Sequence, residues 1–264
     1  MKEFNFIQAV DVILRYNQNN FVEDDYYIKW SNSPVYKLNK SQIYNIACPD
    51  IYGSEIENGI VEKIWFDEIK RCNNKKNLNT DRNRNYKTNA VILESPHKTE
   101  YENHCFINPA LGSTGKKLQQ LFPNLVKKMA SSGLCSDIKN GKYRFILMES
   151  IQHQCSLGIE PINHEIRDLI FSGIWEREDI KNDFLIRLSS YNPDIILNLC
   201  TKGEKAKPEL RILVHNLINK YQKSNTLVKL YRGSHPSSWK GKPDKENTSR
   251  YIQKAEDDKS KKYF

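Results

Sequence analysis

From residue 90 onward, short apolar runs alternate with segments of helical periodicity. Runs rich in Val, Ile and Leu predict four strands, at residues 90–93, 143–148, 194–199 and 227–231. Strands buried on both faces of a parallel sheet have this continuous apolar character. Apolar residues at helical spacing predict helices in between, at residues 114–130, 179–190 and 208–221. This alternation predicts an α/β fold, a three-layer α/β/α arrangement with a central four-stranded parallel sheet.

The flanking parts of the chain have a weaker pattern. Apolar residues at helical spacing predict helices at 3–17 and 55–70. We therefore expect an N-terminal extension, residues 1–88, that is mixed and mostly helical. The main domain is expected over residues 89–243, and residues 244–264 form a charged tail without an apolar stripe, partly helical or mobile.

Two of the predicted strands end in reactive side chains. The run ending at Leu93 leads into Glu94-Ser-Pro-His97 and then Glu100, and the last run leads into His235-Pro-Ser-Ser-Trp239. Open α/β sheets place their ligand crevice at the carboxyl ends of strands, so these two segments are expected to face each other across a cleft. Glu94 as an ion-paired carboxylate, His235 as a turn cap and Trp239 as a packing residue are the structural alternatives.

Charge and cysteine usage narrow the class of protein. The chain has 41 Lys and Arg against 32 Asp and Glu, a net charge of +9, and Asp81 is the only acid between Lys70 and Lys87. A basic balance favours a polyanionic partner, nucleic acid before membrane. The six cysteines have no paired spacing, the N-terminus is polar, and no run approaches the ~18 apolar residues of a membrane span. These features predict a cytoplasmic protein with reduced thiols and no membrane partner.

Two other motifs contain residue types found in ligand sites. Residues 109–117 resemble a phosphate loop but lack its first glycine and its final Ser or Thr, which disfavours nucleotide hydrolysis. The glycines there more simply allow close backbone approach to a ligand at a helix start. His104-Cys105 and His153-Gln-Cys155 lack the usual spacing of zinc ligands, so no metal and no other cofactor is expected.

Taken together, the ordered segments resemble the uracil-DNA glycosylase superfamily over residues 90–239. Leu93-Glu-Ser-Pro-His97 is similar to the Gly-Glu-x-Pro-Gly motif, and Gly233-Ser-His-Pro-Ser237 is similar to the His-Pro-Ser motif. Between them, residues 109–118 are similar to the Pro-Phe-x-Gly-x-x-Gly-x-x-Leu segment, and residues 192–199 are similar to the third strand and its approach.

The resemblance implies a three-layer fold that flips a nucleotide out of the duplex. The matching motif positions imply that either Glu94 or Glu100 orients or activates water. They also imply that His235 donates a hydrogen bond to the departing base. The residues implied at the base are His97, Phe106, Glu149 and Ser150. The residues implied at the DNA backbone and minor groove are Gly112, Ser113, Gly115, Lys116, Ser237, Ser238 and Trp239.

Departures from the family pattern bear on the substrate. Leu93 and His97 replace two glycines, and Ala110 stands where an aromatic ring often stacks on the base, a place that Phe106 can take. Glu149 stands where uracil-specific members usually have Asn. An ionised carboxylate only accepts hydrogen bonds, which suits the amine of cytosine better than O4 of uracil. Cytosine leaves poorly, so the acid form of Glu149 is a hypothetical donor to it.

The sequence therefore predicts a monomeric DNA glycosylase that acts on a modified base in double-stranded DNA. The superfamily includes bacterial anti-phage glycosylases that remove glucosylated hydroxymethylcytosine from phage DNA, and this chain is similar enough to be a candidate for that antiviral role. The alternatives are repair of uracil or another deaminated base, and a catalytically silent nucleic-acid-binding module on the same fold. Lyase chemistry would need Lys98 or Lys240.

Overall fold

The structure is a computed structural model of the 264-residue chain. It describes four stretches almost completely: residues 87–97, 142–156, 164–203 and 206–239. Shorter described pieces are residues 5, 8–10, 12–13, 26–28, 36–38, 50–57, 60–61, 100–102, 105–106, 112–118, 120–122 and 252–254.

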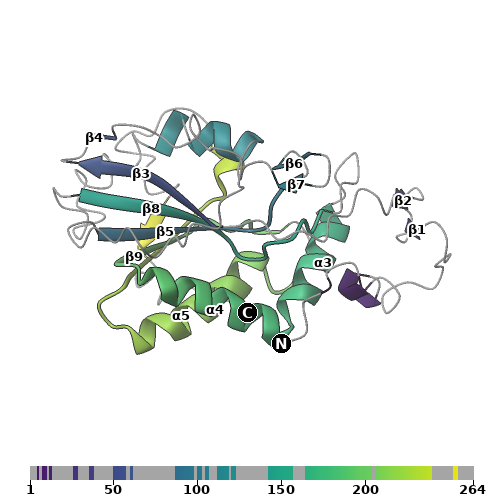
Figure 1. The fold of residues 1–264 in the computed structure, drawn as a ribbon. Coiled ribbons are helices and arrows are strands. Elements are labelled where there is room, and N and C mark those ends of the chain that lie inside the picture. Colours follow the sequence, from purple (N-terminus) through teal and green to yellow (C-terminus); the bar gives the residue numbers. More distant parts are fainter. Residues whose placement is uncertain are drawn as a thin grey trace.

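A parallel sheet forms the centre of the molecule (Figure 1). Its four parallel strands are β5 (Lys87–Leu93), β8 (Lys142–Glu149), β9 (Ile195–Asn198) and β10 (Lys229–Gly233), arranged side by side as β8-β5-β9-β10. The four predicted strands are therefore confirmed, each within a few residues. Antiparallel strands extend both edges, namely β3 (Ile51–Glu57) and β4 (Ile60–Val61) beyond β8, and β11 (Ile252–Lys254) beyond β10.

Side chains of the central strands are buried on both faces of the sheet. On β5, every residue from Ala90 to Leu93 is at most 2% exposed. Ala90 and Ile92 join the core that faces the main helix layer, whereas Val91 points to the opposite face because side chains alternate along a strand. The continuous apolar run of this strand is thus explained by two covered faces.

Helices cover both faces of the sheet (Figure 1). One face carries α3 (His164–Trp175), α4 (Glu178–Tyr191) and α5 (Leu210–Ser224). The other face carries the helical residues 113–118 and 120–122, where the Phe122 ring meets the Phe145 ring of β8 edge-on at 5.0 Å between centroids. The expected α/β/α layering is confirmed. In the part of the chain that is described, no helix has the length and apolar character to cross a membrane.

One helix was not predicted from the sequence. No helix was predicted between residues 148 and 179, yet α3 begins at His164 and buries an apolar stripe that includes Ile166, Ile170 and Ile174. His164, Arg167 and Asp168 interrupt that stripe in the sequence and obscure it. Two of these three polar residues turn out to line the pocket described below.

The flanking regions differ from their predicted structure. Residues 51–57 and 60–61 form strands, so the predicted helix over 55–70 is wrong there, and residues 62–70 lie outside the described residues. Ile56 and Ile60 have helical spacing, but pairing of β3 with the edge of β8 overrides this local preference.

The predicted mostly helical extension contains more strand than helix among its described residues. The helical residues 8–10 and 12–13 agree with the prediction, but the short strands β1 (Tyr26–Ile28) and β2 (Tyr36–Leu38) accompany β3 and β4. The charged tail likewise contributes strand β11. The expected boundary at 88/89 falls inside β5, and β3 of the expected extension pairs with β8 in the main sheet.

Candidate functional site

A pocket of about 250 Å³ opens at the carboxyl ends of the parallel strands. It brings together the two strand ends that the sequence predicted would face each other, with Glu94 after β5 and His235 after β10. The residues that line it include Glu94, His97, Glu100, Ser113, Thr114, Glu149, Ser156, His164, Arg167, Thr201, His235 and Ser237. Seven of the predicted site residues are among them, and they come from segments that are far apart in the chain.

The ends of β5 and β8 are fixed to each other by hydrogen bonds. Leu93 lies opposite Glu149 in the parallel register. Just beyond, the backbone N–H of Ser150 donates to the Leu93 carbonyl and that of Ile151 to the Glu94 carbonyl, each at 3.1 Å. The Ser150 hydroxyl also donates to the Leu93 carbonyl. The carboxyl groups of Glu94 and Glu149 are thereby presented from neighbouring, rigid strand ends.

Glu94 is a buried carboxyl with a partly buried cationic neighbour. Its Oε1 lies 3.4 Å from Nε of Arg167, which is itself held by Asp168 at 2.6 Å. Burial raises the pKa of Glu94 to about 7, although the Arg167 charge acts in the opposite direction and Asp168 adds to the rise. Near neutral pH this carboxyl therefore exists in both protonation states and can either accept or release a proton.

Glu149 lies in a more acidic environment. Burial is the largest cause that raises its pKa well above the ordinary value, and the charges of Glu100 and Glu94 raise it further. Its Oε2 is buried and has no hydrogen-bond partner among the described residues. Buried carboxyl groups that crowd together cannot all ionise, so the neutral acid form of Glu149 is favoured.

His235 is held in one orientation by the turn that follows β10. It caps the short helix η4 (Pro236–Ser238), and its Nδ1 lies 2.8 Å from the Ser237 hydroxyl and 3.4 Å from the Ser237 backbone N–H. A backbone N–H can only donate, so Nδ1 acts as the acceptor and the ring proton belongs on Nε2. Burial, together with the Arg167 charge, lowers the pKa of His235 to about 4. At neutral pH His235 is thus an uncharged hydrogen-bond donor.

The residues predicted at the DNA surface have different positions. Ser113 lines the pocket where the helix over 113–118 begins, and Lys116 is exposed one turn later, its N–H bonded to the Gly112 carbonyl at 3.2 Å. Gly115 is buried on this helix. Ser237 and Ser238 are exposed on η4.

Trp239 is not a surface residue. Its ring is 1% exposed, and its Nε1 donates to the Ser234 carbonyl at 3.0 Å. Burial and the hydrogen bond of this indole support the packing alternative, and the predicted contact of Trp239 with DNA stays a prediction.

Two of the residues predicted at the base, Ser150 and Phe106, are not among the residues that line the pocket. Ser150 is fully buried and uses its hydroxyl to hold Leu93. Phe106 belongs to β7 (Cys105–Phe106), which pairs with β6 (Tyr101–Glu102), but its side chain lies outside the described residues. His104, Ala110, Lys98 and Lys240 also lie outside them. Within the described ranges, no group of three or more His, Cys, Asp or Glu is arranged to hold a metal ion.

Arg167 is one of the pocket residues that sequence reasoning missed, together with Ser156, His164 and Thr201. It lines the pocket from α3, contacts Glu94 and lowers the proton affinity of both Glu94 and His235 through its charge. The apolar stripe of α3 was the available signal, because it would have placed Arg167 on a helix next to the predicted strand ends.

The pocket combines three kinds of chemical group. It holds a carboxyl that titrates near neutrality, a carboxyl favoured as an acid and a neutral imidazole donor, which are Glu94, Glu149 and His235. Such a set can activate water, stabilise positive charge and protonate or hydrogen-bond a leaving group.

Neither a family model, nor a curated protein, nor a solved structure matches this chain.

Proposed function

We propose that this protein is a DNA glycosylase that hydrolyses the N-glycosidic bond of a flipped-out, modified base and leaves an abasic site. The observation that carries the proposal is the meeting of Glu94 and His235, 141 positions apart in the sequence, in one pocket together with Glu149. Hydrolysis of this bond needs a group that acts on water and the sugar, and a second group that acts on the base.

Glu94 serves the sugar side of the reaction. As the bond from C1′ to the base breaks, its electron pair leaves with the base and the sugar becomes oxocarbenium-like. Ionised Glu94 stabilises this positive charge and accepts a proton from the water whose oxygen bonds to C1′. Its pKa of about 7 leaves a substantial ionised fraction at neutral pH. Glu100, buried in the same pocket, is the other carboxyl that can take the water proton.

His235 and Glu149 serve the departing base. The Nε2–H of neutral His235 donates a hydrogen bond to the base as it gains negative charge. In its acid form, Glu149 offers one O–H donor and one carbonyl acceptor, which match N3 and the exocyclic amine of cytosine. Donation to the ring helps a cytosine to leave, because neutral cytosine is otherwise a poor leaving group.

The polar lining favours a substituted base over a plain one. Ser156, His164, Arg167 and Thr201 line the pocket in addition to the groups assigned to the reaction. These side chains can hydrogen-bond hydroxyl groups. A base that carries a sugar, such as glucosylated hydroxymethylcytosine in phage DNA, supplies such hydroxyls, and its excision at many sites would serve antiviral defence.

Uracil repair is a second candidate function, because the neutral form of Glu149 can also hydrogen-bond uracil. A neutral carboxyl can also accept from N3–H of uracil and donate to its O4, whereas an ionised carboxylate repels O4. Because its environment favours the acid form of Glu149, this residue does not by itself exclude uracil.

Base release from defined DNA tests the proposal. The protein is incubated with plain DNA, uracil-containing DNA, and DNA that carries hydroxymethylcytosine with or without glucose. Released bases are identified by mass spectrometry and abasic sites by alkaline cleavage. We expect release of the glucosylated base by the wild type and by E178Q, which alters an exposed glutamate on α4, and none by E94Q. Release of uracil alone would assign repair, and DNA binding without release would assign a silent binding module.

A further inference from the structure

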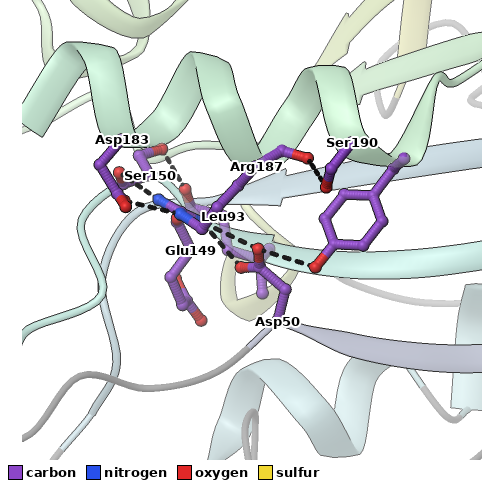
Figure 2. Close-up of polar contacts among 8 residues, drawn as sticks. Asp50, Leu93, Glu149, Ser150, Asp183, Arg187 and Ser190 are labelled. Atoms are coloured by element: carbon purple, nitrogen blue, oxygen red, sulfur yellow. Dashed lines mark hydrogen bonds and ion pairs between the residues drawn. The ribbon is translucent and has the colours of Figure 1, made fainter. Parts of the chain in front are cut away.

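A buried ion-pair network supports the end of β8 from the side of α4 (Figure 2). Arg187 donates from Nη1 to both carboxylate oxygens of Asp50, at 2.8 and 3.1 Å, and from Nε to Asp183 at 2.7 Å. The Tyr191 hydroxyl also donates to Asp50, at 3.2 Å. The side chain of Asp50 is 1% exposed and that of Arg187 is 13% exposed. The guanidinium is therefore held in a fixed orientation.

The same guanidinium holds the main chain that carries Glu149. Its Nη1 donates to the Glu149 carbonyl at 3.1 Å and its Nη2 lies 3.4 Å from the Ser150 carbonyl (Figure 2). From the opposite side, the Ser150 N–H donates to Leu93 at 3.1 Å. The peptide units at the end of β8 are thus fixed both by the neighbouring strand and by a helix. Few alternative positions remain for the Cα atom of Glu149.

We propose that Arg187, fixed by Asp50, is a positioning residue that determines where the Glu149 carboxyl lies in the pocket. This inference rests on the proposed function, in which Glu149 contacts the base. Arg187 does not line the pocket and acts through main-chain atoms. A shift of about 1 Å in a group that contacts substrate can cost on the order of 100-fold in rate, even when its cause lies away from the chemistry.

Charge gives the network a second, separable effect. Glu149 is faced by Glu100, Glu94 and Asp50, whose charges raise its pKa, and by Arg187, whose charge opposes them. A lysine at position 187 would keep the positive charge but could not reach the two carbonyls and the two carboxylates with the geometry of a guanidinium fork. The R187K variant therefore isolates the positioning effect from the electrostatic one.

The network also extends the site beyond the region that carries the sequence resemblance. Asp50 immediately precedes β3, which pairs with β8 as an antiparallel neighbour. A residue from the first 88 positions thereby contacts the arginine that fixes a pocket strand. The part of the chain before β5 contributes to the site through this contact.

The test compares R187K and D50N with the matched control D183N in the full-length protein. D183N also removes a carboxylate partner of Arg187, but the Asp183 side chain is 53% exposed and its loss leaves the contacts to Asp50 and the carbonyls in place. We expect single-turnover base release to fall about 10- to 100-fold in R187K and D50N, with DNA affinity unchanged. D183N should stay within about twofold of wild type. A folded R187K that releases base at the wild-type rate would overturn the inference.

A second readout does not depend on catalysis. The carbon-13 carboxyl resonance of Glu149, assigned with E149Q, reports the position and surroundings of this group. We expect it to shift in R187K and D50N but not in D183N. If the wild type releases no base while this pattern of shifts is observed, the positioning role stands and the glycosylase proposal fails. If the wild type releases base and neither rate nor resonance changes in R187K, the positioning role fails and the glycosylase proposal stands.

Discussion

A single buried carboxyl links the chemistry of the pocket to the stability of the protein. Burial of Glu94 raises its pKa from an ordinary 4.5 to about 7, and Arg167 offsets only part of the cost of burying its charge. The folded protein therefore binds this proton more tightly than the unfolded chain does. Between pH 4.5 and 7 the contribution of Glu94 to the free energy of unfolding falls as the pH rises, because Glu94 ionises later in the folded state.

Replacing Glu94 by Gln should stabilise the folded protein at alkaline pH. A shift from 4.5 to about 7 corresponds to about 3 kcal/mol at pH 8, the upper limit of the gain. Arg167 keeps Asp168 as a partner in the variant. Urea unfolding at pH 5 and pH 8 measures the effect, which should fall to about 1 kcal/mol or less at pH 5. E178Q, at an exposed position of α4, is the control, and an equal effect of E94Q at both pH values would contradict the assignment.

The rate of base release should follow the ionisation of Glu94. If the ionised form acts on water and sugar, kcat/KM should rise about tenfold per pH unit below pH 7 and level off above it. His235, with its pKa lowered to about 4, should add no inflection above pH 5. Rates measured from pH 5 to pH 9 test this, and a flat profile between pH 5 and pH 7 would exclude Glu94 as the group that must ionise.

At the scale of elements, central strands could be predicted and edge strands could not. A strand with neighbours on both sides and helices over both faces must be apolar throughout, which is why Ala90–Leu93 and Ile195–Leu197 stand out in the sequence. Strand β3 owes its conformation to pairing with β8, a contact that no local window contains. The helix α3 was missed because its pocket-facing polar residues break the apolar run.

The site, too, could be predicted only in part from the sequence. Glu94 and His235 could be found because each follows a recognisable strand, and the carboxyl ends of parallel strands lie at one edge of a sheet. Arg167 could not be found without α3, and Arg187 could not be found at all. Its role depends on main-chain carbonyls at the end of β8, which leave no trace in the sequence.

The η4 turn allows a direct test of the role of Trp239. Substitution by Phe removes the hydrogen bond from Nε1 to Ser234 and leaves a cavity around the 1% exposed ring position. We expect W239F to lower the free energy of unfolding by about 1–3 kcal/mol and to leave the Kd for duplex DNA unchanged. Urea unfolding and fluorescence anisotropy measure the two quantities. Weaker DNA binding with wild-type stability would instead support the surface role.

At the scale of the molecule, segments from both flanks complete the sheet. β3 covers the edge of β8 and β11 covers the edge of β10, so both parallel edge strands gain antiparallel partners. Exposed strand edges are prone to pairing with other chains, and these flanking strands remove that hazard for the parallel strands. The flanks are therefore structural parts of the fold.

A chain that begins at residue 89 should be markedly less stable than one that begins at residue 50. The shorter chain loses β3, β4 and the first two residues of β5. It also loses the Asp50 carboxylate, which leaves Arg187 without its buried partner. Breaking a buried ion pair costs about 3–5 kcal/mol. Urea unfolding followed by circular dichroism compares the two chains. Equal midpoints would show that residues 50–88 do not support the sheet.

The contacts of Arg187 at the end of β8 have a consequence for how this protein could change over evolutionary time. The arginine binds carbonyl oxygens, which every amino acid provides, and makes no demand on the side chain at position 149. Residue 149 can therefore be replaced without loss of the hydrogen bonds from Arg187 to the main chain. Under the proposed function, a single replacement at position 149 could alter which base the protein recognises, while Glu94, which follows a different strand, stays the same.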